Sequence, residues 1–321
     1  MKNIGIVSSP LQFLNFAEYI NQLKIKEYFL IVLYYKNIEI QQIEETNLIY
    51  KIQIHKKLKG IPLLQYFWIY FFSSKIKTCH TLILGSFFSD PHLYLNNCLK
   101  KKKLVVVDDG IISYSIQDYI FSKKRMLKSS LYKTLLFKLF KINTVYPSFF
   151  LLFTIFDIKS NKSFITKKND LSFFISNIKS KQINDSILII GQPFVEHKMI
   201  DFCDYECAIN DMILKFKSFK IEYYPSRKEI PFFFRKLNSV NIINPTSNIE
   251  TYLLKNTYLP KYIIGFTSSA LITIDKIINN KEKLIELYYY ELNLNYSRLS
   301  KNSIDNMYKK LIDNGVKKIN L

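Results

Sequence analysis

The sequence predicts an α/β protein built as two halves, each with a parallel sheet covered by helices on both faces, around a central cleft. Two observations carry this prediction. Short apolar segments of strand length alternate with amphipathic segments of helix length along the whole chain. Polar clusters follow several of the expected strands, at the carboxyl ends where open parallel sheets bind ligands.

The first half, residues 1–160, begins with an expected strand at Ile4–Ser8. Pro10 suits the first turn of a helix, and the apolar spacing from Leu11 to Ile20 continues that helix. Further strands of this half are expected at Phe29–Tyr34, Leu48–Ile54, Thr81–Leu84 and Leu104–Val107.

Two strongly apolar segments of the first half are expected to be helices, Ile61–Phe72 and Ser148–Phe156. Both are shorter than the ~20 residues that a membrane-spanning helix needs. Each is expected to lie in the core or at a membrane interface, with the core as the default. Tyr66, Trp68 and Tyr70 of the first segment suit an interface.

A polar stretch without clear period, residues 161–185, is expected to connect the halves. The second half, residues 186–321, repeats the alternation of strands and helices. Its strands are expected at Ser186–Ile190, Ile221–Tyr224, Val240–Ile243, Tyr262–Phe266 and Leu284–Tyr289, and its helices at Met199–Phe219, Ile249–Leu254, Ala270–Ile278 and Ile304–Asn314.

The chain carries 46 Lys and Arg against 26 Asp and Glu, a formal charge of +20, which predicts attraction to an anionic partner. Only four of the basic residues are Arg, the residue that recognises phosphates and bases through bidentate hydrogen bonds. No nucleic-acid partner is therefore expected, whereas peripheral contact with an anionic membrane stays open.

The cysteines are too few and too scattered for a disulfide scaffold, which predicts a reducing compartment. Cys203 and Cys207 lack the ligand spacing of a metal site, so no metal is expected. The N-terminal residues lack the pattern of a secretory signal. The predicted location is the cytoplasm, with peripheral attachment to the inner membrane as an option.

Acidic residues follow two of the expected strands. Asp108 and Asp109 precede Gly110, and a carboxylate there could act as a general base, orient an acceptor hydroxyl or hold a divalent cation. Glu196 follows Gly191-Gln192-Pro193, where it could take a proton from an attacking hydroxyl. The alternatives are a solvated turn for the two aspartates and a helix start for the glutamate.

Hydroxyl and basic side chains follow two more strands. Ser226, Arg227 and Lys228 stand after Tyr224-Pro225, where they could bind a phosphate or a carboxylate. Thr267–Ser269 opens a helix, and free N–H groups at a helix start bind phosphate. The alternative for these hydroxyls is ordinary helix capping.

In their order along the chain, these clusters resemble bacterial sialyltransferases of glycosyltransferase family 52, which include the lipooligosaccharide α-2,3-sialyltransferases and are related to the bacterial polysialyltransferases. The motifs that carry the resemblance are SSPLQ, DDG, GQP with a following acid, YYPSRKE, IETYLL and FTSSA, from Ser8 to about Ala270. The resemblance implies a GT-B-like arrangement of two Rossmann-type domains, a CMP-sialic acid donor, inversion at the anomeric carbon, and no metal or other cofactor.

The resemblance also implies roles for residues. The general base is Glu196, or else Asp109 or Asp108. Ser226 or Tyr224 stands where the family has a donor-contacting His, which predicts weaker acid catalysis, a changed donor or an inactive chain. The donor is expected to contact Gly191, Gln192, Pro193, Tyr224, Pro225, Arg227, Thr267, Ser268 and Ser269, and the acceptor to lie near Ser9, Gln12 and Gly110.

The leading hypothesis is the transfer of sialic acid from CMP-sialic acid to a galactoside of a lipooligosaccharide or capsule, on a lipid-linked acceptor. A homodimer stays open. One alternative is a GT-B transferase that uses another nucleotide sugar, and a second is a non-catalytic basic protein that binds membranes or polyanions. CMP should stabilise a sialyltransferase against thermal unfolding, and UDP or GDP should stabilise a transferase that uses another nucleotide sugar. A non-catalytic basic protein should not be stabilised by nucleotides.

Overall fold

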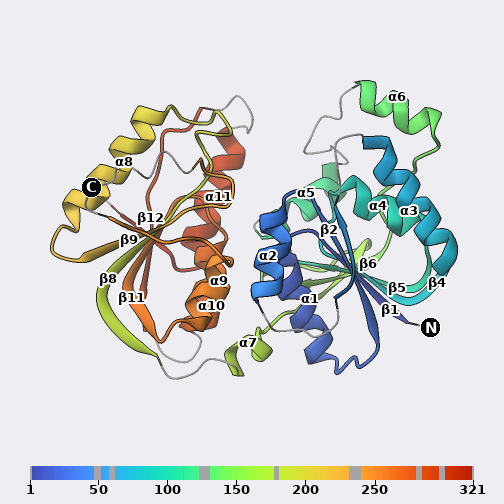
Figure 1. Cartoon of the computed structure of the whole chain (residues 1–321), viewed down its shortest axis with the longest axis horizontal. Helices are drawn as coiled ribbons and strands as arrows, with labels where there is room; N and C mark the ends of the chain where they lie inside the picture. The colour runs from blue at the N-terminus through green and yellow to red at the C-terminus, as the bar shows by residue number, and fades with distance from the viewer. Residues whose placement is uncertain are drawn as a thin grey trace. The chain divides into compact units, whose positions relative to one another are not determined.

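The chain forms two compact units, Met1–Phe173 and Phe174–Leu321, each with its own parallel sheet (Figure 1). The structure is a computed structural model, and it describes residues 2–46, 52–57, 62–110, 112–122, 131–176, 181–230, 240–279, 284–295 and 301–319.

The first unit has a sheet of seven parallel strands among its described residues, in the order β3-β2-β1-β4-β5-β6-β7. The strands are β1 (Asn3–Val7), β2 (Tyr28–Tyr34), β3 (Ile52–Lys57), β4 (Thr78–Leu84), β5 (Lys100–Val107), β6 (Phe150–Thr154) and β7 (Phe164–Lys168). The helices are α1 (Pro10–Gln22), α2 (Asn37–Glu45), α3 (Pro62–Ile76), α4 (Asp90–Cys98), α5 (Tyr114–Ser122) and α6 (Leu131–Leu139), and α7 (Ser172–Ser176) crosses the division between the units.

The second unit has a sheet of six parallel strands in its described part, in the order β10-β9-β8-β11-β12-β13. The strands are β8 (Gln182–Ile190), β9 (Lys220–Tyr224), β10 (Asn241–Ile242), β11 (Tyr258–Gly265), β12 (Glu286–Tyr289) and β13 (Lys317–Lys318). The helices are α8 (Phe202–Lys215), α9 (Ile249–Lys255), α10 (Ala270–Ile278) and α11 (Lys301–Asp313).

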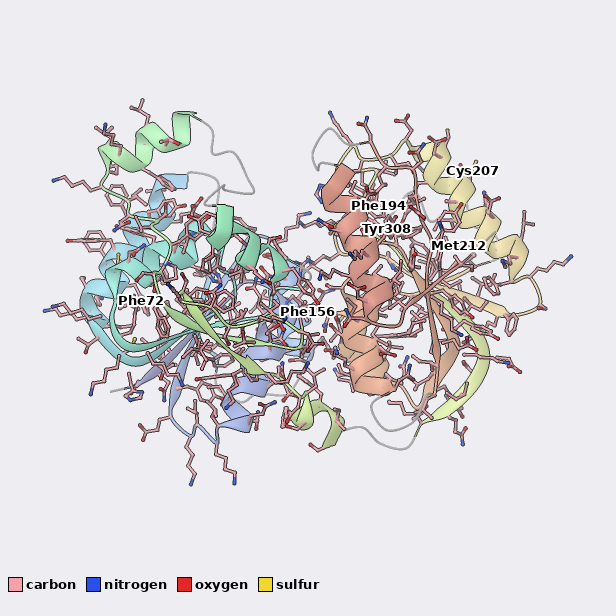
Figure 2. The ribbon with its side chains drawn as sticks, turned by 180° about the vertical axis from the view of Figure 1, so that it is seen from behind. Phe72, Phe156, Phe194, Cys207, Met212 and Tyr308 are labelled. Carbon is pink, nitrogen blue, oxygen red and sulfur yellow. The ribbon has the colours of Figure 1, made fainter. Side chains whose placement is uncertain are left out.

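Apolar runs and helix caps explain these elements locally. The central strands β1, β4, β5, β8 and β11 end in fully buried runs, as expected for strands covered on both faces. The Ser9 side chain accepts from the backbone N–H of Gln12 and caps α1, and Pro10 takes the first helical position. On α8, Met212 is buried whereas Cys207 is exposed (Figure 2).

The predicted fold of two parallel α/β halves is confirmed, with three corrections to its parts. Ser148–Phe156 is not a helix but contains β6, because a short, wholly apolar run suits a buried strand as well as a helix. The segment 161–185 is more than a connection, since it holds β7 and the start of β8. Residues 48–51 of one expected strand lie outside the described residues, and only its later part belongs to β3.

The apolar segment expected at Ile61–Phe72 corresponds to α3, but only one side of that helix is buried in the core. Tyr66 and Ile69 are buried, whereas Leu64 and Phe71 are exposed. Within the described part of the chain, none of the helices combines the length and the apolar character needed to cross a bilayer.

Candidate functional site

Polar side chains gather at the carboxyl edge of each sheet, where the predicted site residues also lie. In the first unit this edge follows β1, β4 and β5, and we call it the first edge. In the second unit it follows β8, β9 and β11, and we call it the second edge. Both edges lie where parallel sheets bind ligands.

Gln12 joins two loops of the first edge. Its Oε1 accepts from the backbone N–H of Ser8 at 2.7 Å, and its Nε2 donates to Asp109 Oδ1 at 2.8 Å. A Cβ at Gly85 would lie 2.6 Å from Gln12 Oε1, so the glycine lets the amide approach β4. Both ends of the Gln12 side chain are therefore engaged within the protein.

Asp108 and Asp109 differ in their surroundings. Asp108 is buried, its Oδ2 accepts from the backbone N–H of Ile155 at 2.6 Å, and its carbonyl accepts from Asn15 Nδ2 at 3.2 Å. Burial raises the pKa of Asp108 to about 7. Asp108 thus holds the ends of β5 and β6 together. Asp109 is partly exposed and is the acid of the pair that a substrate could reach.

His92 is a site residue that the sequence analysis missed. Its Nδ1 accepts from the backbone N–H of Ser86 at 3.2 Å, and its Nε2 lies 2.7 Å from Ser8 Oγ. Because Nδ1 accepts, we assign the proton to Nε2, which then donates to Ser8. Burial lowers the pKa of His92 to about 3. The imidazole is therefore neutral and orients Ser8, and it cannot remove the Ser8 proton to make a nucleophile.

A carboxyl and two phenols form the centre of the second edge. Tyr223 and Tyr205 donate their hydroxyls to Glu229 Oε1, at 2.7 and 3.3 Å, and the backbone N–H of Ser226 donates to Glu229 Oε2. The backbone N–H of Gln192 donates to Tyr205 Oη at 3.1 Å. This network ties α8 and the loops after β8 and β9 into one unit.

The Glu229 carboxyl titrates near neutral pH. Burial, with a smaller contribution from the charge of Glu196, raises the pKa of Glu229 to about 7. Glu196 itself is partly exposed, and its Oε1 accepts from the backbone N–H of Ile230 at 2.7 Å. Two acids from different loops therefore lie close together, one of them able to hold a proton at pH 7.

Gly191 makes this arrangement sterically feasible. A Cβ at position 191 would lie 2.3 Å from the Tyr223 hydroxyl and 2.4 Å from Glu229 Oε2. Both atoms are fixed by hydrogen bonds, so neither can easily move aside. The glycine is required because the carboxyl approaches the backbone at the end of β8.

The loop before α10 presents unused hydrogen-bond donors. The backbone N–H of Thr267 donates to Gln192 Oε1 at 2.8 Å, and Ser268 Oγ accepts from the backbone N–H of Ala270 at 3.2 Å. Within the described ranges, the backbone N–H groups of Ser268 and Ser269 reach no acceptor. They open a buried helix of nine residues, whose N-terminus carries a partial positive charge.

Arg227 adds a full positive charge to the second edge. Its guanidinium is partly buried and makes no hydrogen bond or ion pair with a described residue, although its charge acts on the buried Glu250 of α9. The neighbouring Tyr224 hydroxyl donates to the carbonyl of Ser247, which fixes the turn through the buried Pro225. The guanidinium is thus held on an ordered turn without a strong partner.

The predicted site residues lie in two groups, one at each sheet edge. The second edge holds the predicted acid Glu196 and the predicted donor contacts, from Gly191-Gln192-Pro193, Tyr224–Arg227 and Thr267–Ser269. The first edge holds Ser9, Gln12 and Asp108–Gly110. Gly110 has a φ of 75°, which glycine tolerates best. Among the described residues, no group of His, Cys, Asp and Glu is placed to hold a metal ion.

Three residues of the second edge had no assigned role in the sequence analysis. Glu229 ends the quoted motif YYPSRKE and was recognisable as an acid after a strand end. Tyr205 and Tyr223 stood in apolar helix and strand patterns, where nothing separates a hydrogen-bonded phenol from a packed one.

No known protein family matches the chain, and no curated protein matches it in sequence. Solved structures match its fold. S. aureus MnaA, solved with UDP, is 12% identical with a TM-score of 0.55, over 98% of this chain and 88% of that one. The UDP-GlcNAc 2-epimerase of Methanocaldococcus jannaschii, solved with UDP-GlcNAc and UDP, is 10% identical with a TM-score of 0.55, over 99% and 88%. The UDP-GlcNAc 2-epimerase of Neisseria meningitidis is 11% identical with a TM-score of 0.52, over 84% and 79%.

These comparisons overturn the resemblance to family 52 sialyltransferases, and the expected CMP-sialic acid donor is withdrawn with it. The structure explains why the motifs misled. SSPLQ is a strand end with a helix cap, and FTSSA is another strand end with a helix start. Strand-to-helix junctions of this kind are common in parallel α/β folds, because hydroxyl residues and Pro suit the start of a helix. The chain has a GT-B-like fold, similar to that of the two UDP-GlcNAc 2-epimerases.

Proposed function

We propose that this chain is a nucleotide-sugar-dependent GT-B transferase whose donor is not CMP-sialic acid, and that the donor's diphosphate binds at the second edge. A uridine nucleotide is the first choice, because two of the structural neighbours were solved with UDP. Sugar epimerisation is the second candidate, because two of the neighbours described above are named UDP-GlcNAc 2-epimerases.

The observation that carries the proposal is the set of unused donors at the second edge. The backbone N–H groups of Ser268 and Ser269 stand at the start of α10, and Arg227 stands after the end of β9. Helix N-termini and guanidinium groups are the common donors to phosphate oxygens in proteins. The Gln192–Thr267 and Tyr205–Gln192 hydrogen bonds hold the intervening loop in place, so the donors are ordered before a ligand arrives.

Glu229 supports the same assignment through its charge. With a pKa of about 7, the carboxyl is partly neutral at pH 7, which reduces its repulsion of a diphosphate. A bound anion favours the protonated form further. The predicted general base remains Glu196, which is partly exposed in the loop after β8.

The charge of Glu229 predicts that the affinity for a nucleotide sugar depends on pH. The affinity for UDP-GlcNAc should fall as the pH rises through about 7, and Glu229→Gln should remove the fall, since the amide stays neutral. A UDP-sugar is the right probe, because its diphosphate has no terminal phosphate that titrates near pH 6. Calorimetric titrations between pH 6 and 8 measure it, and an equal fall in the variant would remove Glu229 from the site.

Ligand-induced thermal stabilisation tests the binding proposal. UDP and UDP-GlcNAc should raise the unfolding temperature of the full chain, and CMP should not. Arg227→Ala should weaken UDP binding by about tenfold to a hundredfold, the effect of losing a charge-assisted hydrogen bond. Lys217→Ala is the matched control, because Lys217 is an exposed cation that precedes β9 at the opposite edge of the same sheet. Equal losses in both variants would count against a site at the second edge.

Product analysis separates the two reactions. A transferase releases UDP from the UDP-sugar and adds the sugar's mass to an acceptor, so turnover depends on the acceptor. An epimerase forms an isomeric sugar without any acceptor. Mass spectrometry and chromatography of the products after incubation with a panel of UDP-sugars and glycan acceptors decide between them.

A further inference from the structure

We propose that the first unit docks onto an anionic phospholipid bilayer through the joined outer sides of α3 and α6. We call this surface the α3–α6 face. Its apolar members are Leu64, Phe67, Tyr70, Phe71, Leu135 and Leu139. The proposal does not depend on the reaction that the second edge supports.

Helix α3 is apolar on both sides. Tyr66 and Ile69 are buried against the unit, whereas Leu64, Phe67 and Phe71 follow the spacing i, i+3, i+7 on the other side and are exposed by 60%, 44% and 61%. A surface helix of a globular protein normally places polar residues on its outer side. The outer side of α3 therefore lacks the character of a water-facing surface.

Helix α6 extends the same apolar surface. Leu135 and Leu139, one turn apart, are exposed by 66% and 70%. The Phe137 ring packs edge-on against Tyr66 with a centroid distance of 5.0 Å, and the Phe140 ring against Phe67 at 5.8 Å. The two helices lie at the same end of the first unit in Figure 1. They thus form one surface, and a contiguous apolar patch of this kind marks an interaction site.

The charge of the two chain segments that contain α3 and α6 identifies the partner. No Asp or Glu occurs between Glu45 and Asp90 or between Asp118 and Asp157, and these segments contain 13 Lys and Arg. Four of the lysines on or next to the two helices are exposed, Lys75, Lys77, Lys138 and Lys141. Anionic headgroups attract lysines that lie near a membrane surface.

A bilayer fits this surface better than a second copy of the chain. Two copies meeting through the α3–α6 face would bring lysines against lysines, with no acid in either segment to offset the repulsion. A bilayer takes the aromatic and leucine side chains into the boundary between headgroups and acyl chains, and the lysines against the phosphates. The aromatic side chains Phe67, Tyr70 and Phe71 suit that boundary.

Vesicle co-sedimentation of the full chain tests the proposal. We expect binding to vesicles of phosphatidylcholine with phosphatidylglycerol, weaker binding to phosphatidylcholine alone, and a decrease with added salt. The double variant Leu64→Ser and Phe71→Ser should lower the partition coefficient about tenfold or more, because two exposed apolar side chains no longer enter the bilayer. Lys138→Glu with Lys141→Glu should weaken binding to the anionic vesicles without altering the apolar residues.

The control variant is Leu214→Ser with Ile312→Ser, two exposed apolar residues of α8 and α11 in the second unit. It should bind vesicles as the wild type does. Thermal unfolding and UDP stabilisation, measured on every variant, separate a folding defect from a docking defect. Absence of wild-type binding to anionic vesicles, or equal losses in the α3 and control variants, would overturn the proposal. So would a dimer in solution that the α3 variant dissociates.

Discussion

The two sheet edges use polar side chains in opposite ways. At the first edge, Gln12 is engaged at both ends, and Asp108 and His92 are buried in contact with backbone groups. At the second edge, Glu229 is satisfied by phenols, while Ser268, Ser269 and Arg227 keep donors without acceptors among the described residues. Polar residues at a strand end therefore do not by themselves mark a ligand site. A guanidinium without a partner among the described residues, beside the free N–H groups of a helix start, is the better sign.

The substitution with the strongest expected consequence adds a methyl group to Gly191 at the end of β8. Gly191→Ala should destabilise the second unit by about 1–3 kcal/mol or more and abolish UDP binding, because the new Cβ meets atoms fixed by hydrogen bonds. Chemical denaturation and UDP titration measure the two effects.

Two other glycines serve as controls for this substitution. Gly265→Ala, in the same unit, should be milder, since its Cβ would meet the tip of the Leu271 side chain at 3.1 Å and not an atom held by a hydrogen bond. Gly85→Ala would press on Gln12 at the first edge and should destabilise the first unit while UDP affinity survives. If Gly85→Ala abolished UDP binding and Gly191→Ala did not, the contrast between the edges would be reversed.

A second effect, comparable in its size on stability but without loss of the fold of the site, distinguishes the edges by pH. The pKa of Glu229 is raised from 4.5 to about 7, so its contribution to stability is full below pH 4.5 and is lost as the pH rises to about 7. Relative to Glu229→Gln, the wild type should therefore lose on the order of 3 kcal/mol across that window. Urea unfolding at several pH values, followed by hydrogen exchange of the backbone amides of β8 and β9, measures this difference.

At the first edge, the pH-dependent contributions of Asp108 and His92 to stability oppose each other. Burial raises the pKa of Asp108 from 3.8 to about 7, so its stabilisation is lost as the pH rises through that range. Burial lowers the pKa of His92 from 6.5 to about 3, so its stabilisation is present above pH 6.5 and is lost as the pH falls toward 3. Between about pH 4 and 6.5 the two should nearly cancel, and His92→Asn should expose the Asp108 dependence. An unchanged pH profile in that variant would contradict the assignment of a buried, neutral His92.

The elements of this fold were predictable to the extent that local pattern determines them. The helix Ala270–Ile278 has the predicted bounds, because a strand end, hydroxyl caps and apolar spacing all agree there. The run around Ser148–Phe156 was misassigned, since burial on both faces of a sheet removes the alternation that marks a strand.

The site was predictable only in its location. The strand-end clusters pointed to both edges, but the sequence could not show that Arg227 keeps its guanidinium without a partner among the described residues at the second edge. That property depends on contacts between distant residues, such as Tyr205 of α8 with Glu229, or His92 of α4 with Ser8. The motif order also suggested the wrong family, because helix caps and phosphate sites use the same residue types.

Hydrogen–deuterium exchange with and without UDP is the sharpest test of nucleotide binding at the second edge, because it reports on both edges in one experiment. We expect slower exchange in peptides that cover residues 191–196, 224–230 and 266–271, with no change in peptides that cover residues 8–15, 85–92 and 108–113. Slower exchange confined to the second set, or no change in either set at saturating UDP, would show that UDP does not bind at the second edge.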